Sequence, residues 1–93
     1  MNLEKVPGRN AGNISLYALS TCPWCRKTKQ LLADLGVAYQ FVDVDLLPDA
    51  DKCQAMETIR QCNPTYSFPT MLLDGGKCII GFKEKEIRET FKS

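Results

Sequence analysis

The strongest constraint on the fold of this chain is a strand-helix-strand order over residues 14–44. Ile14–Leu19 is rich in residues that favour strands. From Pro23 onward, apolar side chains recur at helical spacing until Gly36, a residue that can end a helix in the left-handed conformation. Tyr39–Val44 has the composition of a second strand. Strands joined through a helix lie parallel, so the segment predicts a βαβ unit.

The rest of the chain extends this unit into a single domain. A second helix is expected from Asp49, as its N-cap, to about Cys62, where an Asn-Pro pair ends it. Two short apolar runs, Thr70–Leu73 and Cys78–Ile80, flank an Asp-Gly-Gly-Lys turn and predict a β-hairpin. A last helix is expected over residues 83–91. The order βαβ, α, ββα predicts an α/β fold with a four-stranded mixed sheet flanked by helices.

Length and charge exclude several classes of protein. Ninety-three residues support one core, and twelve basic against eleven acidic side chains leave a net charge of +1, which gives no cationic field for nucleic acid. No run approaches the roughly 20 apolar residues of a membrane span. Residues 1–13 lack the apolar core of a signal peptide and are expected to be a flexible leader before a domain at residues 14–93. We therefore expect a cytoplasmic protein, whose closely spaced cysteines are catalytic or metal-binding.

Cys22 and Cys25 form a C-x-x-C pair between the first strand and the first helix. Structural zinc needs four ligands, and the chain has no histidine and no second close pair of cysteines, so we expect no metal. A disulfide closing so short a loop removes little entropy from the unfolded chain and would be a poor staple. The positive end of the helix stabilises a thiolate at Cys22, and Cys25 lies one turn inside, within reach of it. The pair therefore predicts a catalytic thiol–disulfide centre, with Cys25 as the resolving thiol.

Four short motifs follow one another in an order that points to a known family. They are Thr-Cys-Pro-Trp-Cys at 21–25, Ser-Phe-Pro-Thr at 67–70, Asp-Gly at 74–75 and Ile-Gly-Phe at 80–82. With them the chain, from about residue 14 to 91, resembles the glutaredoxins and the glutaredoxin-like redoxins that serve ribonucleotide reductase. The resemblance implies a thioredoxin fold and a monomeric oxidoreductase that reduces protein or glutathione mixed disulfides. We expect such an oxidoreductase to require no organic cofactor, although glutathione can be its reductant or its substrate.

The resemblance also implies a substrate site opposite the cysteine pair. Pro69 would be a cis-proline, and the backbone of Phe68 would pair with a bound peptide or glutathione. Trp24 takes the place of the family's tyrosine as an exposed apolar wall. Gly81 lacks a side chain and so lets a substrate backbone approach closely, and Phe82 completes the expected substrate-binding residues.

The chain departs from the family pattern at positions that bind glutathione. Many glutathione-using members carry Lys three residues before the first cysteine, where this chain has Leu19. The residues that would hold the γ-glutamyl end are replaced by Phe82, Lys83 and Glu84. The segment Gly81–Ile87 is more similar to that of the redoxins that serve ribonucleotide reductase. These departures leave the electron donor open between glutathione and a thioredoxin-reductase-like flavoprotein or a ferredoxin-dependent reductase.

Two further functions have to be weighed against a dithiol reductase. Some glutaredoxins carry an iron–sulfur cluster on one cysteine and glutathione across a dimer. Those members usually have a single active-site cysteine or lack the proline that follows it, so Pro23 argues against this function. A binding-only subunit is disfavoured because both Cys22 and Cys25 are intact.

The other three cysteines are expected to stay outside the chemistry. Cys53 and Cys62 are nine residues apart on the expected second helix, on opposite sides and about 13 Å apart, so they cannot bridge each other. Cys62 is interpreted as an inert core thiol, Cys53 as an oxidisable residue at the edge of the core, and Cys78 as a packing residue of the hairpin.

Overall fold

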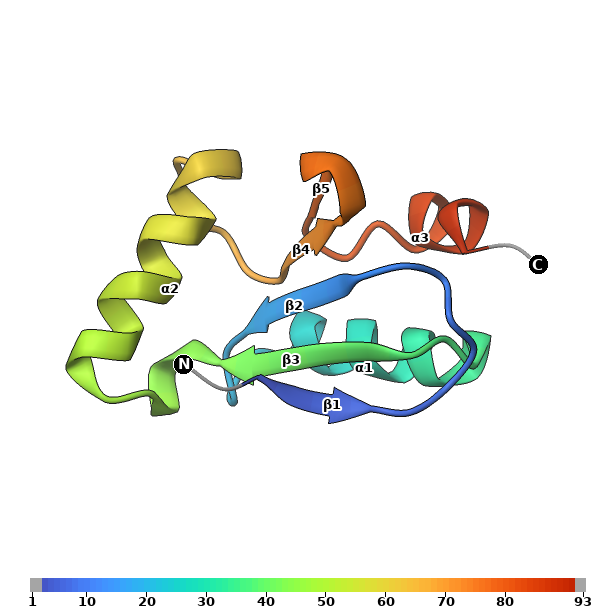
Figure 1. The fold of residues 1–93 in the computed structure, drawn as a ribbon, viewed down its shortest axis with the longest axis horizontal. Helices are drawn as coiled ribbons and strands as arrows, with labels where there is room; N and C mark the ends of the chain where they lie inside the picture. Colours follow the sequence, from blue (N-terminus) through green and yellow to red (C-terminus); the bar gives the residue numbers. More distant parts are fainter. Residues whose placement is uncertain (1–2, 92–93) are drawn as a thin grey trace.

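The computed structural model describes residues 3–91 of the chain. It contains one five-stranded sheet in the order β1-β3-β2-β4-β5 (Figure 1). The strands are β1 (Glu4–Val6), β2 (Ile14–Ala18), β3 (Tyr39–Asp43), β4 (Thr70–Leu73) and β5 (Cys78–Ile80). The helices are α1 (Pro23–Leu35), α2 (Asp49–Cys62) and α3 (Glu84–Thr90), with short 3-10 turns η1 (Val44–Leu46) and η2 (Asp74–Gly76).

The sheet is mixed, as the sequence predicts. Strands β2 and β3 are parallel and are joined through α1, which confirms the βαβ unit. Strands β2 and β4 are antiparallel, and so are β4 and β5, which form the expected hairpin. The helix α1 begins at Pro23 and ends before Gly36, which has a φ of 70° and takes the left-handed conformation expected of it.

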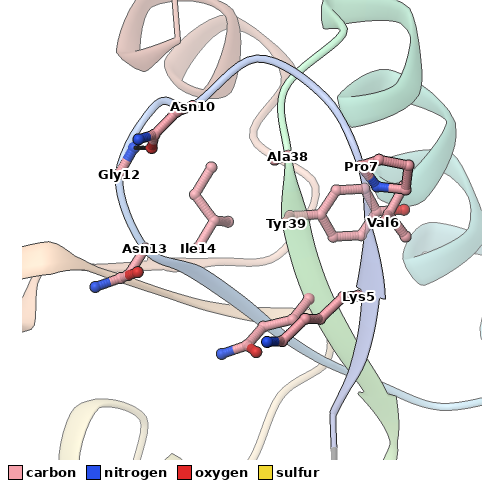
Figure 2. A pocket seen from close by; sticks show the side chains of 10 residues that line it. Lys5, Val6, Pro7, Asn10, Gly12, Asn13, Ile14, Ala38 and Tyr39 are labelled. Carbon is pink, nitrogen blue, oxygen red and sulfur yellow. Dashed lines mark hydrogen bonds between the residues drawn. The ribbon is translucent and has the colours of Figure 1, made fainter.

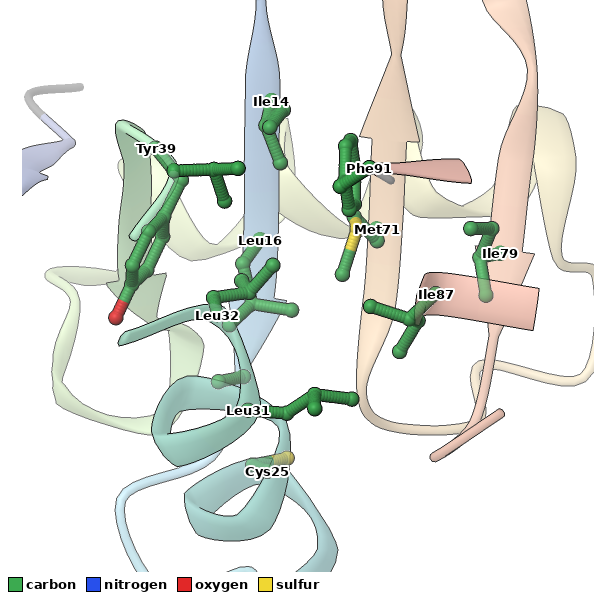
Figure 3. Close-up of a cluster of buried hydrophobic side chains, with 12 residues drawn as sticks. Ile14, Leu16, Cys25, Leu31, Leu32, Tyr39, Met71, Ile79, Ile87 and Phe91 are labelled. Carbon is green, nitrogen blue, oxygen red and sulfur yellow. The ribbon is translucent and has the colours of Figure 1, made fainter. Parts of the chain in front are cut away.

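The helices cover the two faces of the sheet. Alternation along β2 sends Ile14 and Leu16 to the face that α1 and α3 cover, where they pack with Leu32 and Ile87 in the larger core cluster (Figure 3). Tyr17 points to the other face, where a smaller cluster includes Ala55 and Ile59 of α2. The two clusters place one helix on one face and two on the other, which is the layered arrangement of an α/β domain.

The fifth strand corrects the expectation of four. Strand β1 pairs antiparallel with β3, with Glu4 opposite Phe41 and Val6 opposite Tyr39. Beyond it, the backbone N–H of Arg9 donates to the carbonyl of Gly36 at 2.7 Å. Residues 4–6 are therefore an edge strand and not part of a flexible leader, whose first two residues lie outside the described part. A three-residue strand is too short to show an alternating pattern in the sequence.

Two smaller points concern the helices. Asp49 is the first residue of α2, so the position before it, Pro48, is the N-cap and the expectation for Asp49 is off by one residue. Within residues 3–91, none of the helices has the length and apolar character that crossing a membrane requires.

Candidate active site

Cys22 occupies the N-cap of α1, directly after the turn that follows β2. Its sulfur accepts a hydrogen bond from the backbone N–H of Cys25 at 3.2 Å, and its own N–H donates to the carbonyl of Leu19 at 3.2 Å. Pro23 fills the first helical position, where a missing N–H costs nothing. The side chain of Cys22 is half-buried, so its sulfur combines contact with solvent and a position at the positive end of the helix.

Cys25 lies beneath Cys22 and is fully buried. Burial, together with the hydrogen bond with Cys22, raises the pKa of the Cys25 thiol to about 12. A backbone hydrogen bond from Leu19 and the positive charge of Lys29 act the other way and lower this pKa. At neutral pH Cys25 is therefore a protonated thiol.

An ion pair lies one helical turn beyond Cys25. The ammonium of Lys29 is 3.0 Å from a carboxylate oxygen of Asp43, at the end of β3, and the two side chains are 26% and 19% exposed. Lys29 also lies 4.2 Å from the centre of the Phe41 ring. Lys29 is expected near the pair from the sequence, because it lies one helical turn from Cys25. No sequence pattern predicts Asp43 as its partner.

A second carboxylate fixes the turn before Cys22. Asp45 accepts the backbone N–H of Ser20 at 2.9 Å and the Ser20 hydroxyl at 2.5 Å. These two hydrogen bonds hold the pKa of the Asp45 carboxyl below its usual range. Ser20 and Asp45 are 25 residues apart in the chain, so no local sequence pattern predicts the contact.

The expected cis-proline lies at the same edge of the sheet as the cysteine pair. The peptide bond between Phe68 and Pro69 is cis, as predicted. Pro69 directly precedes β4, and Tyr17 near the end of β2 pairs with Thr70 at the start of β4, so the segments carrying Cys22 and Pro69 leave neighbouring strands on one side. Thus the fold brings these two sites together from positions more than forty residues apart in the sequence.

Gly81 joins this edge from the end of β5. Its N–H donates to the carbonyl of Pro69 at 2.8 Å, and its φ of 84° lies in the left-handed region that favours glycine. A Cβ built on Gly81 would meet nothing within 4 Å, so the space beside it is open. This openness is compatible with the close approach of another backbone.

Trp24 and Phe82 form an aromatic pair beside the cysteines. Their ring centroids are 5.9 Å apart with the planes inclined by 28°, and 54% of Trp24 is exposed. The ammonium of Lys27 lies 4.7 Å from the centre of the Trp24 ring. Trp24 is thus exposed as expected, with Phe82 stacked against it. A pocket of about 200 Å³ opens between α1 and α3 and is lined in part by Lys27 and Phe82.

A larger pocket, of about 450 Å³, lies at the other end of the sheet (Figure 2). It is lined by residues of the 5–13 segment and by the first residues of two strands, Ile14 and Tyr39. The larger pocket lies at Ile14, where β2 begins, whereas Cys22 lies beyond Ala18, where β2 ends. The length of this strand therefore separates the larger pocket from the cysteine pair. The smaller pocket is the one that adjoins the candidate site.

The remaining cysteines include an unexpected pair. Cys62 and Cys78 form a disulfide, with their Cα atoms 6.3 Å apart. The interpretation of both as unpaired packing thiols is therefore wrong, because the last turn of α2 directs Cys62 toward the first residue of β5. Cys53 is a free, exposed thiol. Across residues 3–91, no group of three or more Cys, Asp, Glu or His side chains is arranged to hold a metal ion.

Comparisons with known proteins agree with this geometry. The glutaredoxin family model matches residues 14–79. A glutaredoxin-like 8.6 kDa protein in the rubredoxin operon of Clostridium pasteurianum is 36% identical over 74 residues, which cover 80% of this chain and 91% of that protein.

Two crystal structures match nearly the whole chain. The methanoredoxin of Methanosarcina acetivorans is 50% identical, with a TM-score of 0.89 over 92% of this chain and 90% of that one. The glutaredoxin of Methanosarcina mazei is 46% identical, with a TM-score of 0.91 over 100% of this chain and 90% of that one. The fold is therefore that of thioredoxin-like redoxins, and the chain, a thiol–disulfide oxidoreductase, belongs to the glutaredoxin family.

Proposed function

We propose that this oxidoreductase reduces protein disulfides by a dithiol mechanism, with Cys22 as nucleophile and Cys25 as resolving thiol. The observation that carries the proposal is the contrast between the two sulfurs. Cys22 is half-buried at the N-cap of α1 and accepts an N–H, whereas Cys25 is fully buried beneath it. Cys22 can therefore meet a substrate disulfide from solvent. Cys25 is shielded from solvent and reacts only with the mixed disulfide that forms at Cys22.

The two steps balance without a further cofactor. The thiolate of Cys22 attacks one sulfur of the substrate disulfide, which breaks that bond and releases one substrate thiolate. The sulfur of Cys25 then attacks Cys22 in the mixed disulfide, forms the Cys22–Cys25 bond and releases the second substrate thiolate. Forming this bond removes the proton of Cys25, which passes to one departing thiolate, and the other departing thiolate takes a proton from water. The substrate gains two electrons and two protons, and an external dithiol or two thiols later restore the protein.

The substrate is proposed to bind between the Phe68–Pro69 backbone and the Trp24–Phe82 pair. Phe68 is half-buried, and the open space at Gly81 leaves room for a peptide backbone along this edge. The stacked rings provide an apolar wall for the residues that flank the substrate disulfide. An extended peptide would gain backbone hydrogen bonds on one side and apolar contact on the other.

Single-cysteine variants test the assignment of roles. Cys22→Ser should abolish disulfide reduction and the rapid alkylation of the protein. Cys25→Ser should still release one thiol from a disulfide substrate and stop as a stable mixed disulfide, visible by mass spectrometry. Cys53→Ser removes an exposed thiol remote from the pair along the chain and is the matched control. Turnover retained by Cys22→Ser would overturn the mechanism.

A comparison of reductants tests the donor. Turnover is measured with glutathione and its reductase, with a thioredoxin-reductase-type flavoprotein and with a ferredoxin-dependent reductase, each on the same protein disulfide. We propose that a protein reductase supports faster turnover than glutathione, because Leu19 and Phe82 stand where glutathione-binding residues are expected. Faster turnover with glutathione would refute this part and leave the roles of Cys22 and Cys25 standing.

A further inference from the structure

The Cys62–Cys78 disulfide joins two elements that the candidate active site depends on. Cys62 is the last residue of α2 and Cys78 is the first residue of β5, sixteen positions further along. Strand β5 pairs with β4, where Cys78 lies opposite Leu72. In Figure 1 the yellow end of α2 and the orange strand β5 lie on the same side of the molecule. The covalent bond thus fixes the end of a helix to an edge strand.

The last residues of α2 have no buried side chain. The buried side chains of the helix are Ala55 and Ile59, so its core contacts stop at the beginning of its last turn. In that turn Arg60 is exposed and pairs with the exposed Glu57 on the same helix. Cys62 is the one residue after Ile59 in α2 that this structure links covalently to the sheet. Without the bond, the last turn is expected to fray more readily.

The segment that begins directly after Cys62 carries the cis-proline. Asn63 is buried, and its side-chain amide donates to the carbonyl of Ser67 at 2.9 Å and to the hydroxyl of Thr70 at 3.2 Å. The Thr70 hydroxyl donates in turn to the Ser67 carbonyl at 2.7 Å. These bonds shape the turn that presents Phe68 and Pro69. A shift of the α2 end would move Asn63 and with it this network.

Both oxidation states can be accommodated at the pair. In the disulfide form the two half-buried sulfurs are bonded to each other. In the dithiol form the sulfur of Cys78 has an acceptor for its proton, because the carbonyl of Gly76 lies 3.6 Å away. Neither sulfur belongs to the larger or the smaller core cluster, so opening the bond leaves both clusters intact.

We propose that Cys62 and Cys78 are a second thiol–disulfide couple of this domain, whose oxidation fastens the segment that holds Pro69 and whose reduction loosens it. Oxidation requires a small-molecule disulfide as electron acceptor. One thiolate of the pair attacks it and releases one thiol, and the other then displaces the second thiol. Two protein thiols and one disulfide become one protein disulfide and two thiols. The effect on substrate affinity rests on the proposed function, whereas the redox couple itself does not.

The redox couple is tested in a chain that retains only these two cysteines. The variant Cys22→Ser, Cys25→Ser, Cys53→Ser is equilibrated with buffers of oxidised and reduced dithiothreitol, alkylated and weighed by mass spectrometry. We expect zero alkylated thiols at one end, two at the other, and a single two-electron transition between them. Two free thiols under the most oxidising buffer, or a bond that no buffer opens in the folded protein, would overturn the proposal. Adding Cys62→Ser should leave one thiol that forms no intramolecular bond.

The structural coupling is tested on the same chain in its two oxidation states, without a further mutation. Amide hydrogen exchange at residues 63–70 should be faster in the reduced form than in the oxidised form, while exchange in α1 should be unchanged. Equal exchange at residues 63–70 in both forms would overturn the fastening role even if the couple titrates.

The functional consequence is tested with the active-site cysteines present. Cys62→Ser, Cys78→Ser should raise the KM for a protein disulfide by about fivefold, the low end of typical coupling between sites. The kcat should not change, because Cys22 and Cys25 are untouched. Cys53→Ser should leave both constants unaltered. An equal KM in the double variant refutes the coupling. Inactivity of the unmodified protein would refute the proposed function instead, and the titration above would still stand.

Discussion

The ring of Trp24 stacks on the ring of Phe82, and this contact joins the first turn of α1 to the segment between β5 and α3. The two residues are far apart in the sequence, yet together they border the site that contains Cys22. Phe82 directly follows Gly81, where the space beside the backbone is open, so we expect the pair to limit which thiol compounds can lie along that edge.

Removing the Phe82 ring should therefore improve the use of glutathione. We expect Phe82→Ala to lower the KM for glutathione about fivefold, which corresponds to about 1 kcal/mol, because the tripeptide gains the space between α1 and α3. Steady-state kinetics with glutathione and its reductase measure the change. Leu46→Ala removes an exposed apolar side chain elsewhere and should have no effect. A higher KM in Phe82→Ala would mean that the ring binds glutathione.

The resolution step should accelerate with pH. Burial raises the pKa of Cys25, so the thiolate fraction is small at pH 7 and grows with pH. We expect the rate constant for resolution to rise between pH 7 and 10. Quenched-flow measurement of the second thiol released from a preformed mixed disulfide of Cys22 reports it. A rate independent of pH in this range would contradict the expectation.

A charge variant checks the physical cause. The positive charge of Lys29 lowers the pKa of Cys25, so Lys29→Met should raise that pKa further and slow resolution at every pH in the range. Lys85→Met removes an exposed charge on α3 and is the matched control, with no change expected. Equal slowing by both variants would point to net charge instead of the local contact.

Reduction of the Cys62–Cys78 bond should lower the free energy of unfolding. A disulfide that closes a loop of this length stabilises a folded chain by about 3 kcal/mol through the entropy of the unfolded state. Urea unfolding of the chain lacking Cys22, Cys25 and Cys53, with and without a dithiol, measures the difference. The denaturant slope should also increase on reduction, since the unfolded chain becomes more expanded. Coincident unfolding curves would show that the bond does not constrain the unfolded chain.

Asn63→Ala should weaken both the fold and substrate binding. The substitution removes the amide donor of two hydrogen bonds, one to the partly buried carbonyl of Ser67 and one to the buried hydroxyl of Thr70, at a cost of about 2 kcal/mol in the free energy of unfolding. The KM for a protein disulfide should rise, because the turn before Pro69 loses its internal support. Chemical denaturation and steady-state kinetics measure the two effects. Asn13→Ala, at an exposed position, should change neither.

The bounds of α1 and of the hairpin could be predicted because local chemistry sets them. Pro23 suits only the start of a helix, and Gly36 can take the left-handed conformation that ends one. The Asp-Gly-Gly-Lys turn likewise fixes where β4 ends and where β5 begins. The position of Cys22 at the N-cap follows from the same local signals.

The features that the sequence did not reveal depend on contacts between distant elements. Whether Cys62 meets Cys78 depends on the direction in which α2 ends and on the register of β5, and neither is encoded near either cysteine. The same holds for the pairing of Lys29 with Asp43, which requires α1 to lie against the end of β3. Tertiary geometry, and not propensity, decides such contacts.

Strand β1 has a further consequence for how molecules of this protein behave in concentrated solution. Without it, the five-residue strand β3 would be the outermost strand and would offer its unpaired backbone groups to any neighbouring chain. With it, the outermost strand has three residues, Glu4, Lys5 and Val6, and is followed by a proline. Short, charged edges that stop at a proline are poor templates for growth of a sheet from one molecule to the next. We therefore expect strand β1 to protect the domain from aggregation.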